Sequence, residues 1–379
     1  MAWVIVSILG RMAIHSAIHE SYAKYNLAAW LESIAYNLNI FKFGSGQDFA
    51  LTRADNLASD YLVRRRRHFG TLFRQNLLAV IVYAVAGSLM LGLGGWLVMQ
   101  GQINLGQFVA AELIIFGVLG AFLNFVSKLE YLYDMVAAMD KLAAIHEVSK
   151  ERQGGHAISL EAAPELVCNN ISYAFSNQHS VIEHVTFTVE PGSSVSILAD
   201  TGMDRAVLAD VLVGLRNPTS GHVQVNGLDL RQLDLGAYRE KVAYINHLEI
   251  LEGSILENLR FGNSSDLPEI QAVLQSLGLS KRIEQLTEGL STPLVPRGLP
   301  LTRTEQRLLM IARAVLSKPR LIVIDAVLDE VDTSALKLAS KTLQAVEQPW
   351  TLIVLTQSAE VAGNFGRVVK LDKLNGVQP

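Results

Sequence analysis

The stretch Val195–Gly221, VSILADTGMDRAVLADVLVGLRNPTSG, decides the fold of the second half of the chain. A β-branched apolar run ends at Leu198, and the loop Ala199–Asp204 separates it from a helical pattern that starts at Arg205. That pattern consists of apolar residues recurring at i, i+3 and i+4, namely Val207, Leu208, Val211, Leu212 and Leu215. A strand, a loop and a helix in this order are the context that a phosphate-binding loop requires.

Strands and helices alternate through the rest of this half. The apolar run Leu321–Ile324 ends at Asp325, as a buried parallel strand should, and Thr351–Leu355 is a second run of this kind. The other predicted strands are Ile171–Phe175, Val185–Val189 and a hairpin around Gly227. The predicted helices are Asp266–Gln285, Thr304–Leu316 and Leu336–Val346. This alternation predicts an α/β domain that binds ligands beyond the carboxyl ends of its strands.

The first half has the composition of a membrane protein. Of the 379 residues, 50% are hydrophobic and 18% are charged, and the mean hydropathy is +0.28. Leu77–Met99 and Gly106–Val126 are each long enough to cross a bilayer core of roughly 30 Å, and their short link predicts an antiparallel hairpin. Because Arg64–Arg67 precedes the hairpin and Lys128 and Lys141 follow it, the positive-inside rule places both outer flanks in the cytoplasm.

Other features limit the possible partners and compartments. The net charge of −4 gives no indication of a nucleic-acid partner, and a single cysteine, Cys168, excludes an internal disulfide. Met1–Leu9 is apolar but too short to span a membrane, so we expect it to be the lower end of a span. Gly44 and Gly46 interrupt a long helical pattern that runs from about Arg11 to Arg74.

Several segments resemble those of an ATP-binding-cassette (ABC) exporter half-transporter, in which membrane spans precede the nucleotide-binding domain. They are PTSGHVQVNGLDL (Pro218–Leu230), GSILENLRFG (Gly253–Gly262), QRLLMIARAVLSKPRLIVID (Gln306–Asp325) and Asp332. In addition, Ala28–Gly44 resembles the cytoplasmic coupling segment of such exporters. The resemblance implies a partial α-helical transmembrane domain at residues 1–150, a linker at 151–164 and a P-loop NTPase-like ABC nucleotide-binding domain at 165–379.

The resemblance also implies an ATP and Mg²⁺ site at named positions of this chain. Phe175 stands where an aromatic ring stacks on adenine, Gly202 is the glycine retained in the phosphate loop, and Arg205 replaces its lysine. The remaining positions are His247 in place of a glutamine that senses the γ-phosphate, Asp325 as the Mg²⁺ ligand, and Gln357 in place of a histidine.

Other positions depart from what nucleotide chemistry needs. Asp204 brings a carboxylate to an anion site, where two like charges about 4 Å apart repel by roughly 4 kcal/mol. Ala206 lacks a hydroxyl for Mg²⁺, and Ala326 replaces the expected catalytic glutamate. The signature loop, Leu301–Glu305, reads LTRTE instead of presenting bare glycine backbone to a partner's ATP. We therefore name no catalytic residue, and ATP binding becomes doubtful.

The sequence predicts an export-type ABC transporter-like subunit with degenerate motifs, truncated at its N-terminus. We expect it to be non-hydrolysing and to act as a homo- or heterodimer with another ABC subunit. We expect it in the inner (plasma) membrane, with the nucleotide-binding-like domain in the cytoplasm. Three alternatives stay open: an active ATP-driven exporter subunit with atypical motifs, a structural or regulatory membrane protein, and a truncated relic or mis-started reading frame.

Overall fold

The computed structural model describes residues 10–148, 150–175, 180–199, 201–295, 298–345, 349–372 and 376–378. The chain divides into two compact units, one ending at Lys150 and the other beginning at Glu151. Three positions that carried predictions lie outside the described residues: the apolar segment Met1–Leu9, Asp200 in the loop, and Val346.

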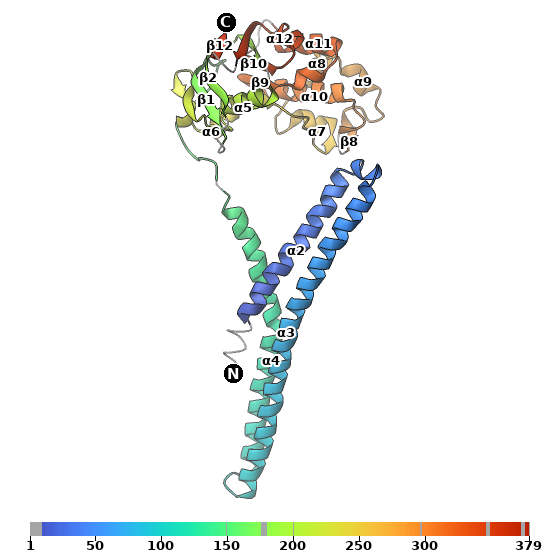
Figure 1. Ribbon diagram of the computed structural model, residues 1–379, viewed down its shortest axis with the longest axis vertical. Helices are drawn as coiled ribbons and strands as arrows, with labels where there is room; N and C mark the ends of the chain where they lie inside the picture. Colours follow the sequence, from blue (N-terminus) through green and yellow to red (C-terminus); the bar gives the residue numbers. More distant parts are fainter. Residues whose placement is uncertain are drawn as a thin grey trace. The chain divides into compact units, whose positions relative to one another are not determined.

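The first unit is helical. Its elements are α2 (Gly10–Tyr36), the short 3₁₀ turn η2 (Ile40–Lys42), α3 (Gly46–Met99) and α4 (Leu105–His146). The three long helices of the described residues pack against one another, and α3 and α4 run side by side as a hairpin (Figure 1). Within the described part of the chain, α3 and α4 are the two helices long and apolar enough to cross a membrane. The predicted pair of apolar spans is thus confirmed as two helices that extend well beyond the apolar runs.

Glycine makes the sharp reversal between α2 and α3. Gly44 has a φ of +57°, in the left-handed region. A Cβ atom on Gly46 would lie 2.8 Å from the carbonyl oxygen of Ile40, so only glycine fits there without displacement of the turn. The predicted interruption of the long helical pattern is therefore located at this turn.

Polar side chains join the three helices of the first unit. The Gln75 amide donates to the hydroxyl of Tyr133 at 2.9 Å, and both side chains are buried. A Cβ atom on Gly10 would lie 3.3 Å from the same hydroxyl, so α2 comes close to the pair. Nearby, Arg65 of α3 pairs with the buried Glu20 of α2 at 2.5 Å.

The second unit is built on a mainly parallel sheet. In the described residues this sheet has six strands in the order β12-β11-β3-β10-β9-β6, and only β12 is antiparallel to its neighbour. The strands are β3 (Ser194–Ala199), β6 (Val242–Ile245), β9 (Leu321–Asp325), β10 (Thr351–Thr356), β11 (Arg367–Asp372) and β12 (Gly376–Gln378). Every residue of β9 and β10 is buried, which confirms the two predicted core strands.

The sheet separates two hydrophobic cores. Along β9, Leu321 and Val323 belong to one core cluster, whereas Ile322 and Ile324 belong to the other. Because successive side chains of a strand point to opposite faces, this strand contributes to both cores. The predicted α/β class is confirmed.

A smaller antiparallel sheet covers part of the domain, in the order β2-β1-β4-β5 among the described residues. It consists of β1 (Leu166–Ala174), β2 (Ser180–Val189), β4 (Ser220–Val225) and β5 (Leu228–Asp229), and a separate pair is formed by β7 (Gly253–Ser254) and β8 (Pro293–Leu294). Gly221 has a φ of +75°, and a Cβ atom there would lie 2.2 Å from the carbonyl oxygen of Asn170. The hairpin predicted around Gly227 is confirmed as β4 and β5.

The helices of the second unit differ slightly from the predicted ranges. They are α5 (Gly202–Leu212), α6 (Leu235–Arg239), α7 (Ile255–Arg260), α8 (Leu267–Ser276), α9 (Ser280–Glu284), α10 (Arg303–Leu316), α11 (Thr333–Leu343) and α12 (Ala359–Ala362), with 3₁₀ turns η3 (Leu230–Gln232), η4 (Gly289–Ser291) and η6 (Val327–Glu330). The single helix predicted for Asp266–Gln285 is wrong, because Gly278, with a φ of +73°, lies between α8 and α9. The predicted start of α5 at Arg205 is three residues late, because Thr201 caps the helix.

Candidate functional site

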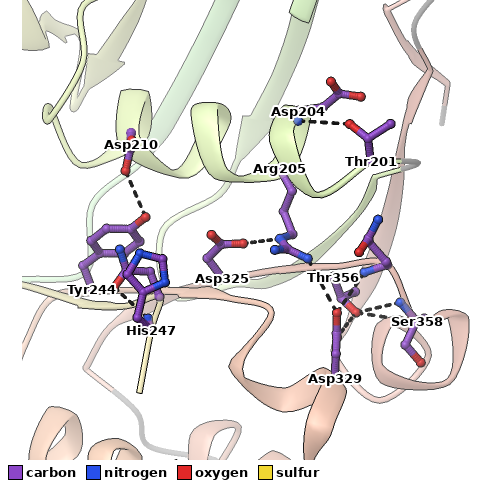
Figure 2. A network of polar contacts seen from close by, with 12 residues as sticks. Thr201, Asp204, Arg205, Asp210, Tyr244, His247, Asp325, Asp329, Thr356 and Ser358 are labelled. Atoms are coloured by element: carbon purple, nitrogen blue, oxygen red, sulfur yellow. Dashed lines mark hydrogen bonds and ion pairs between the residues drawn. The ribbon is translucent and has the colours of Figure 1, made fainter. Parts of the chain in front are cut away.

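The predicted phosphate loop leads from the carboxyl end of β3 into the N-terminus of α5. Thr201 is the N-cap of α5, and its hydroxyl accepts the backbone N–H of Asp204 at 3.2 Å (Figure 2). A phosphate at a helix N-terminus would need such N–H groups for itself. One of the donors that the helix start could offer to an anion is therefore bonded within the loop.

Arg205 points from α5 toward the ends of the central strands. Its guanidinium donates to the carboxylate of Asp325, the last residue of β9 (Figure 2). Only 13% of the Arg205 side chain and 3% of the Asp325 side chain are exposed. The cation predicted to replace a phosphate-binding lysine is thus bound to the carboxylate predicted to hold Mg²⁺.

A second carboxylate, Asp329 in η6, completes the environment of Arg205. It lies 3.8 Å from the guanidinium. Asp329 also accepts a hydrogen bond from the Thr356 hydroxyl and one from the backbone N–H of Gln357, the latter at 3.2 Å. We call Arg205, Asp325, Asp329, Thr356 and Gln357 the closed polar network, because it joins α5, β9, η6 and the end of β10 through its own members.

Gly202 lies under this network. A Cβ atom on Gly202 would lie 3.8 Å from a terminal guanidinium nitrogen of Arg205 and 3.9 Å from the side-chain oxygen of Gln357. Both side chains therefore lie within van der Waals reach of the place that a side chain at residue 202 would take. The structure brings together four of the residues predicted for the site: Gly202, Arg205, Asp325 and Gln357.

The electrostatics of the network are dominated by buried carboxylates. Burial raises the pKa of the Asp325 carboxyl above its ordinary value, although the charges of Arg205 and His247 act to lower it. Asp204 is 4% exposed. Two carboxylates, Asp325 and Asp329, face the single guanidinium of Arg205, and this excess of negative charge disfavours a polyanionic ligand.

His247 is near this group but outside the network. Its side chain is exposed, and its backbone N–H donates to the side-chain oxygen of Asn246 at 2.8 Å. In Figure 2 it lies beside Tyr244 on the side of Asp325 away from Asp329.

Phe175 lies in a different cluster. Its ring packs edge-on against Tyr173 at 5.4 Å between centroids, and the Arg216 guanidinium is 5.9 Å from its centroid. Arg216 pairs in turn with Asp210 of α5 at 2.7 Å, and Asp210 accepts the hydroxyl of Tyr244 at 3.1 Å. Burial, together with the charge of Asp210, raises the pKa of Tyr244. A chain of polar contacts thus runs from the aromatic position to the sheet.

The signature loop is also bonded within itself. Thr302 and Glu305 form a capping box at the start of α10, in which each side chain accepts the other residue's backbone N–H. Arg282 lies 3.3 Å from the carboxylate of Glu305. As at α5, a helix N-terminus that could bind an anion is satisfied by the chain's own oxygen atoms.

Sequence reasoning missed two contributors to the site. Asp329 was overlooked because the family resemblance directed attention to Asp332, which instead caps α11 by accepting the backbone N–H of Ala335 at 2.8 Å. Thr356 follows directly after the predicted strand Thr351–Leu355, and nothing in its local sequence predicts a role in the site. The available signal was a pair of acidic residues four positions apart after a buried strand. Ala326, between them, has a φ of +58°.

No group of three or more histidine, cysteine, aspartate or glutamate side chains in the described ranges could hold a metal ion. Asp325 is the residue of this region that was predicted to bind Mg²⁺, and in the structure its carboxylate faces Arg205.

Comparison with known proteins places these observations in a family. Residues 182–328 match the family model described as ABC transporter. The chain is 24% identical over 298 residues to the uncharacterized ABC transporter ATP-binding protein YknV of Bacillus subtilis (strain 168), covering 76% of this chain and 48% of that protein. It is 25% identical over 340 residues to the ATP-dependent lipid A-core flippase of Acinetobacter baylyi, covering 86% and 58%. The chain thus spans about half the length of the curated relatives it matches.

A solved structure of a bacterial Atm1-family ABC exporter with ATP bound has the same fold. The TM-score is 0.88 at 18% sequence identity, and the match covers 98% of this chain and 66% of that one. The helical region and the α/β domain of this chain therefore both match parts of one known fold.

Proposed function

This chain belongs to the ABC transporters of the exporter type, with fused membrane and nucleotide-binding domains, and from that premise we propose that it is a non-hydrolysing membrane subunit. Its α/β domain keeps the family fold but does not turn over ATP, and a second transporter subunit supplies the catalysis. In this proposal residues 1–150 belong to the transmembrane domain, 151–164 form the linker and 165–379 form the nucleotide-binding-like domain.

The observation that carries the proposal is the ion pair between Arg205 and Asp325. Mg·ATP is the ligand that the family implies, and it needs both groups free, one for phosphate and one for the metal's water shell. With Asp329 beside the pair, the residues present do not fit Mg·ATP.

Two positions that lack a functional side chain also argue against ATP hydrolysis. Ala206 and Ala326 offer neither a hydroxyl nor a carboxylate. Removing a single electrostatic or positioning group from such a site lowers the rate by about two to three powers of ten or more. Losing several together leaves no useful hydrolysis.

The capped α10 supports dependence on a partner. In this family two domains form composite sites, and each signature loop faces the other subunit's nucleotide. Because Thr302 and Glu305 satisfy the start of α10 and Glu305 adds negative charge, this chain would weaken its partner's site as well. At most one site of a dimer with a complete subunit would then hydrolyse ATP, and a homodimer would hydrolyse none.

We further propose that the chain lies in the inner (plasma) membrane with its α/β domain in the cytoplasm. The two apolar helices and the basic residues that flank them, Arg64–Arg67, Lys128 and Lys141, support this orientation.

The test is nucleotide binding and turnover by the purified full chain in lipid nanodiscs, with and without Mg²⁺. We expect no saturable Mg²⁺-dependent ATP binding and no turnover above that of an Arg205→Ala variant. ATP turnover that falls when Arg205 is replaced would overturn the proposal and favour an active exporter subunit. The retained Phe175 and Gly202 are the residues that support this alternative. Co-purification that recovers no second transporter subunit would contradict the partner role.

A further inference from the structure

The residues that enter the α/β unit are firmly bound to it. We call Glu151–His156 the entry strap. The backbone N–H of His156 donates to the carbonyl oxygen of Gln232 at 2.7 Å, and the backbone N–H of Asp234 donates to the carbonyl oxygen of His156 at 2.9 Å. A Cβ atom on Gly155, which has a φ of +136°, would lie 2.5 Å from the Leu233 backbone. The strap therefore follows the Leu230–Asp234 segment closely.

An arginine of the strap strengthens this attachment. The Arg152 guanidinium donates to the carbonyl oxygens of Leu233 at 2.6 Å and Leu230 at 3.4 Å, and also to that of Arg231. These carbonyl groups end η3, where a cation is favourable. The strap is thus held by charge-assisted bonds as well as by backbone bonds.

A second arginine connects the strap to α5. Arg239 of α6 binds the Glu151 carboxylate in a bidentate manner, at 2.9 and 2.6 Å. The same guanidinium donates to the carbonyl oxygens of Gly214 at 2.5 Å and Val213 at 3.3 Å, immediately after α5. Next to it, the buried Tyr238 donates its hydroxyl to the carbonyl oxygen of Leu212 at 3.0 Å. One guanidinium therefore binds the strap and the C-terminal end of α5 at once.

The opposite end of α5 carries Arg205 of the closed polar network. The helix has 11 residues, which corresponds to about 16 Å of continuous backbone. An arginine–carboxylate pair is present at each end: Arg239 with Glu151, and Arg205 with Asp325. We infer that Arg239 couples the entry strap to the closed polar network through α5. A displacement of the chain at Lys150 would then be transmitted to the network even when no nucleotide is bound.

This coupling gives the proposed non-hydrolysing subunit a way to respond to its membrane helices. The inferred coupling rests on the proposed function only in assuming that no nucleotide opens the closed polar network. The coupling and the lack of hydrolysis are measured by different experiments. ATP turnover tests hydrolysis, and hydrogen exchange tests the coupling whether or not ATP binds.

The experiment compares amide hydrogen exchange in the full chain, in lipid nanodiscs, before and after Arg239→Gln. We expect exchange to accelerate at least tenfold at the His156 amide and also at the Asp204 and Arg205 amides, which bond to Thr201 at the far end of α5. The matched control is Arg231→Gln, because the Arg231 side chain pairs with Asp229 at 2.6 Å and, among the described residues, makes no hydrogen bond to the strap. It should leave all three amides at the original rates.

A milder variant separates coupling from general unfolding. Glu151→Gln keeps the bonds of Arg239 to Val213 and Gly214 and removes only the carboxylate, so α5 should stay folded. If the strap amide accelerates in this variant while the Asp204 and Arg205 amides stay unchanged, the inference is wrong. Coupling is reciprocal, so Arg205→Ala should in turn accelerate exchange at His156.

Discussion

The guanidinium of Arg205 forms an ion pair with the carboxylate of Asp325, although 120 residues separate them in the sequence. This pair joins the first helix after β3 to the last residue of β9. In the proposed function, this pair withholds both groups from phosphate and metal, because the cation and the carboxylate bind each other.

Replacing Arg205 with alanine should destabilise the protein by about 3–5 kcal/mol, because Asp325 is left buried without its cation. Millimolar Mg²⁺ or Ca²⁺ should recover part of this loss, because removing the guanidinium leaves the carboxylates of Asp325 and Asp329, which both lie against it in the parent chain, without a positive charge. The measurement is the thermal unfolding midpoint of the full chain in detergent, with and without the cation. The Arg205→Lys variant keeps the positive charge but lacks the planar guanidinium, so it should lose less stability than Arg205→Ala. Equal losses of stability in both variants would contradict this account.

The buried carboxyl of Asp325 makes stability depend on pH. Burial raises the folded-state pKa of Asp325 above its ordinary 3.8, so the stability that its neutral form contributes is fully present below pH 3.8 and is lost as the carboxyl ionises with rising pH through the folded pKa. Asp325→Asn removes this titration. The stability difference between the variant and the parent chain should therefore shift in favour of the variant as pH rises above 3.8, as followed by denaturant unfolding at a series of pH values. A difference that stays constant across that range would show that Asp325 does not titrate as described.

Gly46→Ala should loosen the turn between α2 and α3, because the added methyl group would lie 2.8 Å from the Ile40 carbonyl oxygen and 2.9 Å from the Phe41 Cα. We expect faster limited proteolysis between Asn37 and Ser45 in the intact chain. The control is Gly70→Ala within α3, where nothing lies within 4 Å of the new Cβ atom. That variant should be neutral or slightly stabilising, and equal proteolysis of the two would argue against a steric origin.

Tyr133→Phe should cost about 1 kcal/mol, because it removes the hydrogen bond from the buried Gln75 amide. The measurement is the thermal unfolding midpoint in detergent. Replacing Gln75 with leucine in the same chain should restore part of the loss, because no unsatisfied amide then remains. A double variant as unstable as the sum of the single variants would indicate that the two side chains act independently.

The fold was largely predictable from local patterns. Unbroken apolar runs at Leu321–Ile324 and Thr351–Leu355 identified buried strands, since no exposed element carries such runs. The two apolar helices were equally clear from length. The break at Gly278 was not foreseen, because a glycine inside a helical pattern is compatible with either a helix or its end.

The site was predictable only in part. The prediction that individual nucleotide contacts are lost rests on the residue identities at Ala206 and Ala326, and it stays a prediction. The contacts of the closed polar network could not be predicted in this way, because the partner of Arg205 depends on how β9, η6 and α5 meet in space. Asp329 and Thr356 carry no motif, and their role follows from the three-dimensional arrangement alone.

The position of Asp329 also limits what a single substitution at residue 205 can change. A lysine in place of Arg205 would still meet Asp329, whose carboxylate is fixed by Thr356 and by the Gln357 backbone. Opening this region to a triphosphate would therefore require several substitutions at once, because each one alone leaves the other contacts in place.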